Sequence, residues 1–330
     1  MEKVDILLAT YNGEKYLSEQ IDSILSQSFK EFRLLISDDC STDNTRKILE
    51  KYASKDNRIK IYFQKQNLGV IKNFEFLLKK VENKYYMFSD QDDIWKEKKI
   101  EKSLKVIKET KSDLVYSDLE VVDEKLNVIC KSYWKLKGFY KKITKYNNFE
   151  SLYLNNFVTG CTMLSKKDLI KEFMPLPKNS KFVLYDYWIA LILSQRYKIT
   201  YINEPLIRYR QHKNNAVGSK KKTDELKTVD EIRKLFINVK KEHFKTFIEN
   251  EDKFIDEKFK RLNIEALEYY KMLENKNKIN FRKWGLFFKL YKYEDFFYTI
   301  QNFLILNMPI VAKLLFKLKR GKYEKSKKNN

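Results

Sequence analysis

Four short apolar runs recur along the first third of the chain, and helix-like patterns fill the intervals between them. The runs cover residues 4–10, 32–36, 59–63 and 85–88. After the first run, for example, Leu17, Ile21 and Ile24 recur at three- and four-residue spacing, which is typical of an amphipathic helix. This alternation predicts consecutive βαβ units, and therefore an α/β fold with a mostly parallel sheet flanked by helices.

The pattern becomes less regular further along. Residues 114–130 predict a strand, a hairpin turn and a second strand, whereas residues 131–150 lack a clear period and are interpreted as a loop. An apolar run over 157–164 predicts a strand that carries Gly160, where a ligand or another backbone comes close. From about residue 220 the spacing of apolar residues predicts long amphipathic helices. We therefore expect an α/β domain over 1–219, with halves 1–110 and 111–219, and a helical, basic and aromatic region over 220–330.

Composition and charge narrow the function classes. The chain is 43% hydrophobic and 15% aromatic with only 7 Gly and 4 Pro, which is typical of a globular protein. Its three cysteines are far apart in sequence and favour neither a disulfide framework nor a Cys-x-x-Cys metal site. The net charge of +22 permits a nucleic-acid-binding protein, which is the alternative from a different class. The excess lysine is spread along helical faces and no recognised nucleic-acid motif is present, so we expect no nucleic-acid partner.

The last 50 residues are strongly basic and aromatic, a combination that suits an anionic membrane surface. Residues 296–312 carry no charge, but this stretch is polar and short for a span of roughly 20 residues. We expect an interfacial helix anchored by the basic residues 313–328; the alternative is ordinary core helices with a solvated end. No apolar signal segment opens the chain, so we expect a cytoplasmic protein, peripheral at the inner face of the cell membrane.

Three carboxylates crowd the end of the fourth apolar run, at Asp90, Asp92 and Asp93. Such like charges repel one another unless a cation or a set of N–H donors neutralises them. Hard oxygen ligands of this kind suit Mg²⁺ or Mn²⁺, usually shared with substrate phosphates. The alternative is a solvated loop that opens the following helix and is balanced by the lysines at positions 96, 98 and 99.

Polar residues end three of the predicted strands, at Thr10-Tyr11-Asn12, Asp38-Asp39 and Asp90-Gln91-Asp92. In open α/β sheets a ligand lies at the carboxyl ends of the strands, so these groups are expected to converge. Neither a dinucleotide-binding glycine fingerprint nor a phosphate-binding P-loop motif is present. A nucleotide held through a metal at the fourth strand remains open. Asp39 taken alone is also suited to capping the next helix.

Taken together, the runs Thr10–Gly13, Ser37–Thr45, Asn67–Gly69 and Asp90–Asp93 resemble, in order and spacing, family 2 glycosyltransferases with a GT-A fold. The resemblance covers about residues 1–220. It implies a nucleotide-sugar-binding half over 1–110, an acceptor half over 111–219, and Mg²⁺ or Mn²⁺ as cofactor. It also implies that Asp39 contacts a pyrimidine base, that Thr10, Tyr11 and Asn12 line the nucleoside pocket with Asn67 and Gln91, and that Asp90 and Asp92 lie at ribose and metal.

Two later segments offer candidates for the remaining roles. Asp186 is the one acid in an otherwise apolar helical pattern, and inverting sugar transfer needs a base for the acceptor hydroxyl. The resemblance places that base at the start of a helix here; a capping acid is the alternative, and Asp118 is the second candidate. The resemblance also implies that His212 is a metal ligand rather than a structural residue. Arg210 or Lys213 could hold diphosphate oxygens.

The pairing of Ser-Asp-Gln-Asp-Asp-Ile-Trp with Arg-Gln-His most resembles the bacterial rhamnosyltransferase branch. This implies a dTDP-rhamnose donor and a glycan or lipid-linked glycan acceptor in surface polysaccharide synthesis. A hexosyl- or N-acetylhexosaminyltransferase using a UDP-sugar is the nearest alternative. A nucleotidyltransferase, which would release pyrophosphate, is a further one. The sequence leaves the oligomeric state open.

Overall fold

The computed structural model describes residues 2–312, apart from 147, 179, 181, 213–227, 275–280, 294–295 and 309–310. Its contacts divide the chain into two compact units. The first comprises Met1–Asn179 with Leu184–Gly218, and the second Ser180–Val183 with Ser219–Asn330. All the predicted site residues belong to the first unit.

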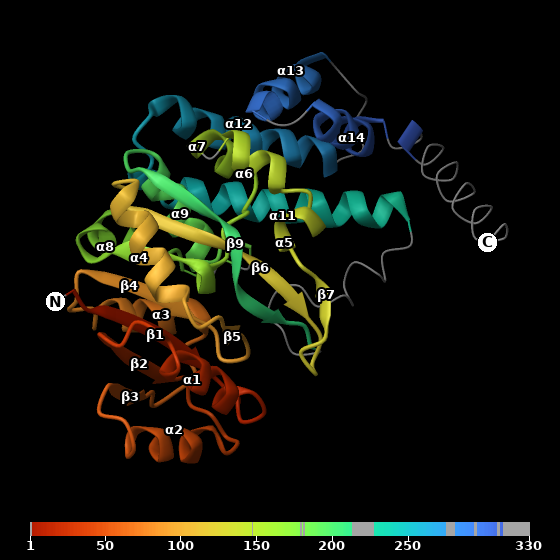
Figure 1. Ribbon diagram of the computed structural model, residues 1–330. Helices are drawn as coiled ribbons and strands as arrows, with labels where there is room; N and C mark the ends of the chain where they lie inside the picture. The colour runs from red at the N-terminus through yellow and green to blue at the C-terminus, as the bar shows by residue number, and fades with distance from the viewer. Residues whose placement is uncertain are drawn as a thin grey trace. The chain divides into compact units, whose positions relative to one another are not determined.

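The first unit is built on one mixed sheet whose order is β3-β2-β1-β4-β8-β6-β9-β5. Its parallel part comprises β1 (Val4–Thr10), β2 (Phe32–Asp38), β3 (Ile59–Phe63) and β4 (Tyr85–Ser89), which lie side by side in red to orange in Figure 1. The connections are α1 (Leu17–Leu25), α2 (Thr45–Ala53) and α3 (Val70–Leu78). Every residue of β4 is buried, as expected for a central strand covered on both faces.

The remaining strands extend the sheet with mixed directions. They are β5 (Ile94–Trp95), β6 (Leu114–Val122), β7 (Val128–Cys130), β8 (Leu164–Lys166) and β9 (Ile199–Arg210). The short strand β8 pairs antiparallel with both β4 and β6, whereas β9 is parallel to β6 and holds β5 on its other side. Helix α4 (Lys99–Glu109) leads from β5 to β6. The predicted α/β sheet is confirmed, and each of its antiparallel pairs includes β7, β8 or β9.

Two predicted elements of the second half are wrong. Residues 131–150 contain helical turns rather than a loop, namely α5 (Tyr133–Leu136), α6 (Tyr140–Tyr146) and the start of α7 (Phe149–Leu154). The predicted strand over 157–164 is a 3₁₀ turn, η1 (Gly160–Thr162), that leads into β8. Its apolar side chains are buried core residues on irregular backbone. Further on lie η2 (Lys167–Leu169), α8 (Ile170–Phe173) and α9 (Tyr185–Ser194).

An ion pair between a buried aspartate and a partly exposed arginine links β1 to β2. Asp5 and Arg33 are register partners on the two strands, and the Asp5 carboxylate is fully buried. It accepts hydrogen bonds from Arg33 Nε at 2.8 Å and Nη2 at 3.0 Å, and from the backbone N–H groups of Glu82 and Asn83. The charge is therefore compensated at the start of both strands, away from their carboxyl ends.

The second unit is helical, as predicted. Its elements are α11 (Val229–Glu249), η3 (Glu251–Lys253), α12 (Glu257–Glu274), α13 (Phe281–Leu290), η4 (Tyr291–Tyr293) and α14 (Phe296–Asn307). Thr228 opens α11 with a reciprocal capping box to Glu231. Among the described residues, none of the helices has the length and apolarity needed to cross a membrane. The interfacial helix stays a prediction, because its basic anchor at 313–328 lies outside the described residues.

Candidate active site at the carboxyl ends of β1, β2 and β4

One side-chain amide fixes the loop after β1 to the loop after β4. Gln91 Oε1 accepts hydrogen bonds from Thr10 Oγ1 at 2.6 Å and from the Tyr11 N–H at 2.9 Å, and Gln91 Nε2 donates to the Tyr11 carbonyl at 3.1 Å. Gly13 is packed against the same amide, since a Cβ there would lie 2.3 Å from Gln91 Oε1. The structure therefore brings together three residues that the sequence assigns to nucleotide-sugar binding.

The loop after β1 is also joined to the loop after β2. Asn12 has a left-handed backbone, with φ of 47°, and its N–H donates to Ser41 Oγ at 2.9 Å. Its side-chain oxygen accepts from the Thr42 N–H at 2.8 Å. Gly13 N–H donates to Thr45 Oγ1 at 2.8 Å. Asn12 thus uses its side-chain oxygen to hold the two loops together, and its contact with a nucleoside stays a prediction.

Asp39 holds the segment that precedes α3 rather than capping the next helix, α2. Its side chain is buried, and the two carboxylate oxygens accept from the N–H groups of Leu68 at 2.7 Å and Gly69 at 2.9 Å. Asn67 Nδ2 donates to the Asp39 carbonyl at 3.2 Å. The predicted residues Asp39 and Asn67 are therefore adjacent. Each carboxylate oxygen keeps a second lone pair, so a contact with a base stays a prediction.

The two predicted metal ligands are in contact, although they are 120 residues apart in sequence. Asp92 Oδ2 lies 2.7 Å from His212 Nε2, and their side chains are 16% and 9% exposed. Asp92 comes from the loop after β4, whereas His212 follows the end of β9. The His212 ring also packs against Tyr16, with 4.8 Å between ring centroids.

A cavity of about 520 Å³ opens at these residues, a size ordinary for small-molecule sites. Among the described residues it is lined by Tyr11, Asn12, Gly13, Lys15, Tyr16, Gln91, Asp92, Glu124 and His212. Lys15 and Glu124 form an ion pair of 2.8 Å in this lining, although their side chains are 65% and 43% exposed. Sequence reasoning missed both, because they lie 109 residues apart and exposed charges usually mark a solvated face.

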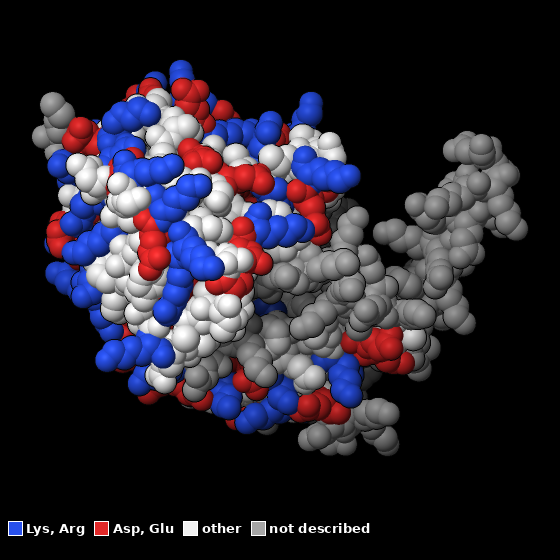
Figure 2. Space-filling view, turned by 90° about the horizontal axis from the view of Figure 1, so that it is seen from below, with Lys and Arg blue, Asp and Glu red and all other residues white. Residues whose placement is uncertain are grey.

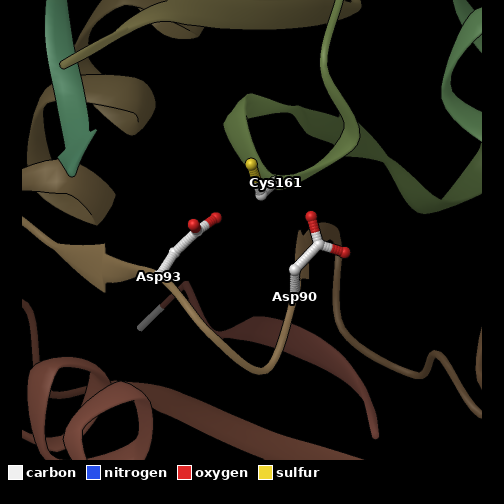
Figure 3. A group of neighbouring side chains, drawn as sticks. All are labelled: Asp90, Asp93 and Cys161. Carbon is white, nitrogen blue, oxygen red and sulfur yellow. The ribbon is translucent and has the colours of Figure 1, made fainter. Parts of the chain in front are cut away.

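A second group of possible ligands lies beside Asp92. Figure 3 shows the side chains of Asp90, Asp93 and Cys161 gathered in one place, and one ligand atom from each lies within 4.8 Å of the others. Burial raises the pKa of Asp90 to about 7, helped by the charges of Asp92 and Asp186. Burial likewise raises the pKa of Asp93 and of Cys161 well above their usual values. These shifts favour the neutral forms of all three groups.

A buried lysine faces this acidic cluster. Lys99 is fully buried, with its ammonium nitrogen 3.3 Å from the centroid of the Trp95 ring. Burial lowers its pKa to about 7, opposed by the charges of Cys161 and Asp93. Asp93 and Lys99 are both buried, so the alternative of a solvated loop is wrong for these two residues. A cation fits better on the cavity side of Asp92 and His212, which offer oxygen and nitrogen ligands there, than beside Lys99.

Asp186 combines the geometry of a helix cap with the environment of a base. It lies in the first turn of α9, and its oxygens accept from the N–H groups of Gly160 at 3.0 Å and Tyr187 at 2.6 Å. Burial raises its pKa to about 6, although these N–H groups oppose the shift. Gly160 is required by packing, because a Cβ there would lie 2.1 Å from the Tyr185 hydroxyl. The charge of Asp186 is one of the causes that raise the pKa of Asp90.

Asp118, the second candidate base, has a structural environment. Its carboxylate is buried and accepts from the N–H groups of Leu119 at 2.8 Å and Trp134 at 3.1 Å, and from the Ser132 hydroxyl. Asp118 therefore holds the start of α5 (Tyr133–Leu136) against the middle of β6.

Arg210 donates hydrogen bonds to three segments that are far apart in sequence. Its side chain is 2% exposed, and it donates from Nε to the Asp92 carbonyl at 2.9 Å, from Nη1 to the Glu124 carbonyl at 2.8 Å and from Nη2 to Glu19 Oε2 at 2.7 Å. A direct contact between Arg210 and a diphosphate stays a prediction. Lys213, the alternative, lies outside the described residues.

The comparisons with known proteins agree that the similar proteins are glycosyltransferases. The sequence model described as "Glycosyl transferase family 2" matches residues 5–174. The chain is 33% identical over 223 residues to "dTDP-rhamnosyl transferase RfbG" of Shigella flexneri, covering 64% of this chain and 74% of the relative. It is 28% identical to "UDP-Glc:alpha-D-GlcNAc-diphosphoundecaprenol beta-1,3-glucosyltransferase WfgD" of Escherichia coli, covering 68% of this chain and 82% of the relative.

Among solved structures, the mannosyltransferase PcManGT from Pyrobaculum calidifontis, in complex with GDP-Man and Mn²⁺, matches with a TM-score of 0.57 at 14% identity. The match covers 96% of this chain and 79% of that one. The predicted GT-A fold is confirmed by this likeness.

Proposed function

This chain belongs to glycosyl transferase family 2 and is a glycosyltransferase, and from that premise we propose that it transfers rhamnose from dTDP-rhamnose to a growing bacterial surface polysaccharide with inversion. The contact between Asp92 and His212 at the cavity carries the proposal, because it assembles a metal-binding pair beside the Asp-x-Asp motif. The relative named as a dTDP-rhamnosyl transferase supports the donor.

The donor would bind with its nucleoside at the strand ends and its diphosphate toward Asp92. Thr10, Tyr11, Asn12, Asp39 and Asn67 surround the nucleoside in this proposal, with Asp90 at the ribose. Gln91 keeps the loops after β1 and β4 in register for that contact. Mg²⁺ or Mn²⁺ held by Asp92 and His212 would supply positive charge to the departing nucleoside diphosphate.

Asp186 would take the proton of the acceptor hydroxyl as that oxygen attacks the anomeric carbon of the donor sugar. A carboxyl with a pKa of about 6 is mostly ionised at neutral pH, yet it is more basic than an ordinary aspartate. The N–H groups of Gly160 and Tyr187 fix the carboxylate in one orientation. Direct displacement by one attacking oxygen accounts for inversion.

A UDP-sugar donor is the second candidate, since WfgD is named for a UDP-Glc donor. The same name contains a lipid-linked diphosphate acceptor, which supports a glycan or lipid-linked glycan acceptor for this chain. Such an acceptor would bring the enzyme to the inner face of the cell membrane, where the basic C-terminal residues suit anionic lipids. Co-sedimentation with vesicles of anionic or neutral lipid tests that association.

Nucleic-acid binding has less support. On the face shown in Figure 2, blue and red side chains are interspersed over the described residues rather than gathered into one basic field. A backbone-binding groove requires clustered Lys and Arg.

Nucleotide-induced thermal stabilisation tests the donor class. We would compare dTDP, UDP, GDP and a mononucleotide, each with and without Mn²⁺, on the native chain, D92A and the exposed-acid control E109A. A ligand that binds only the folded state raises the melting temperature. We expect dTDP to stabilise the native chain and E109A in a metal-dependent way and D92A little. Metal-independent binding, or equal shifts in D92A, would contradict the proposed site. Rhamnosyl transfer with release of dTDP, rather than pyrophosphate, then identifies the reaction.

A further inference from the structure

The proposed reaction places a diphosphate in a cavity whose known lining carries little net positive charge. Over the residues that the structure describes, the lining side chains that can carry a charge near neutral pH are Lys15, Asp92, Glu124 and His212. Asp92 and His212 are the proposed metal ligands, and Glu124 would repel a diphosphate. A positive side chain close to the phosphates would add to the charge of the proposed cation.

Arg210 is poorly placed to be that group. Its three donor atoms each donate to the protein, and its side chain is 2% exposed. Releasing it toward a ligand would leave the Asp92 and Glu124 carbonyls without these donors. Its position suits a residue that fixes both walls of the cavity.

Lys15 is better placed, because it lines the cavity and its side chain is 65% exposed. Its partner is Glu124, itself 43% exposed, and an ion pair between exposed groups contributes only about 0–1 kcal/mol. The pair can therefore be exchanged at small cost. The pKa of Lys15 is raised by its hydrogen bond to Glu124 and by Tyr16, so the ammonium stays charged at neutral pH.

We propose that Lys15 binds the diphosphate of the donor, and that Glu124 holds the Lys15 ammonium at the cavity wall until the donor replaces it. The inference rests on the proposed function, which supplies a nucleoside diphosphate as ligand. Arg210 is then a positioning residue, since its bond to the Glu124 carbonyl fixes the hairpin that carries this carboxylate.

Isothermal titration calorimetry separates the diphosphate contact from the nucleoside contact. The probes are dTDP and thymidine with Mn²⁺, and the proteins are the native chain, K15M, K15R, E124Q and K47M. Lys47 is an exposed lysine on α2, so K47M removes the same charge outside the cavity lining. Losing one charge-assisted hydrogen bond should weaken dTDP binding by about 10- to 100-fold in K15M. Thymidine binding should not change.

Further outcomes bear on each part of the proposal. K15R and K47M should bind dTDP like the native chain, and E124Q should bind it a few-fold more tightly. K15M that binds dTDP within about twofold of the native chain overturns the role of Lys15. If E124Q binds dTDP no more tightly than the native chain, the exchange with Glu124 is overturned. A native chain that binds neither dTDP, UDP nor GDP overturns the proposed function itself, and the role of Lys15 falls with it.

Discussion

Replacing Asp186 with asparagine separates a base from a helix cap, because the two roles predict different stabilities. The carboxyl pKa of about 6 in the folded chain lies above the ordinary value of 3.8. A shift of roughly two units corresponds to about 3 kcal/mol. Since the folded state holds its proton more tightly, this contribution is complete below about pH 4 and is lost as the pH rises to about 6. At neutral pH the ionised carboxylate therefore destabilises the fold.

Asparagine removes that charge but keeps one oxygen acceptor. We expect D186N to lose one of the two backbone hydrogen bonds, which costs about 1–1.5 kcal/mol. The net result above pH 7 is a chain about 1–2 kcal/mol more stable than the native one. Its kcat should fall by about 10²- to 10⁴-fold, because no base remains for the acceptor hydroxyl.

The assays are urea denaturation at pH 7.5 and the pH profile of kcat/KM. For the native chain, kcat/KM should fall tenfold per pH unit below about pH 6 as Asp186 becomes protonated. D118N is the matched control, since Asp118 accepts three hydrogen bonds in a structural setting; it should lose stability and keep the native pH profile. Turnover by D186N within tenfold of the native rate would refute the role as base. An inactive D186N that is also destabilised would favour the cap alone.

Two substitutions test packing and charge. G160A should lower the unfolding free energy by about 1–3 kcal/mol and reduce turnover, because its Cβ overlaps the Tyr185 hydroxyl. The control G285A lies in an open helical position and should instead stabilise the protein by about 1 kcal/mol. Similar effects of the two substitutions on thermal unfolding would contradict the packing argument. R33M should destabilise by about 1–3 kcal/mol at neutral pH, since it removes the ion-pair partner of the buried Asp5 carboxylate, while kcat at a permissive temperature stays native. Unchanged urea unfolding of R33M would show that the neighbouring N–H groups suffice.

The parallel half of the sheet could be predicted because its signals are local. Each of β1 to β4 is an apolar run with a helical pattern after it, and three of the runs end in polar residues. The helical turns after residue 132 could not be found this way. Elements of four to seven residues complete fewer than two turns, so no helical period develops. The core segment around Cys161 was mistaken for a strand because burial, rather than strand pairing, makes it apolar.

Some site residues could be predicted from local sequence patterns, and others could not. The placement of Asp39, Asp90 and Asp92 follows from strand ends, but the meeting of Asp92 with His212 was reached through family resemblance and not from periodicity. The burial of Lys99 could not be predicted, since a lysine is almost never expected in a core. Lys99 is buried beside the Trp95 ring and near Cys161, which lies 62 residues further along the chain, and one sequence does not reveal that neighbour.

The position of β9 has a consequence for the order in which the protein acquires its site. This strand is inserted between β6 and β5, and its end carries Arg210, which bonds to Glu19 across 191 residues. Contacts that close so long a loop form late, because their chain entropy must be overcome first. During synthesis the four parallel strands can therefore assemble while the Asp92 loop still lacks Arg210 and His212. Nucleotide binding would be a property of the finished first unit, and a nascent chain that ends before β9 should carry the sheet without the site.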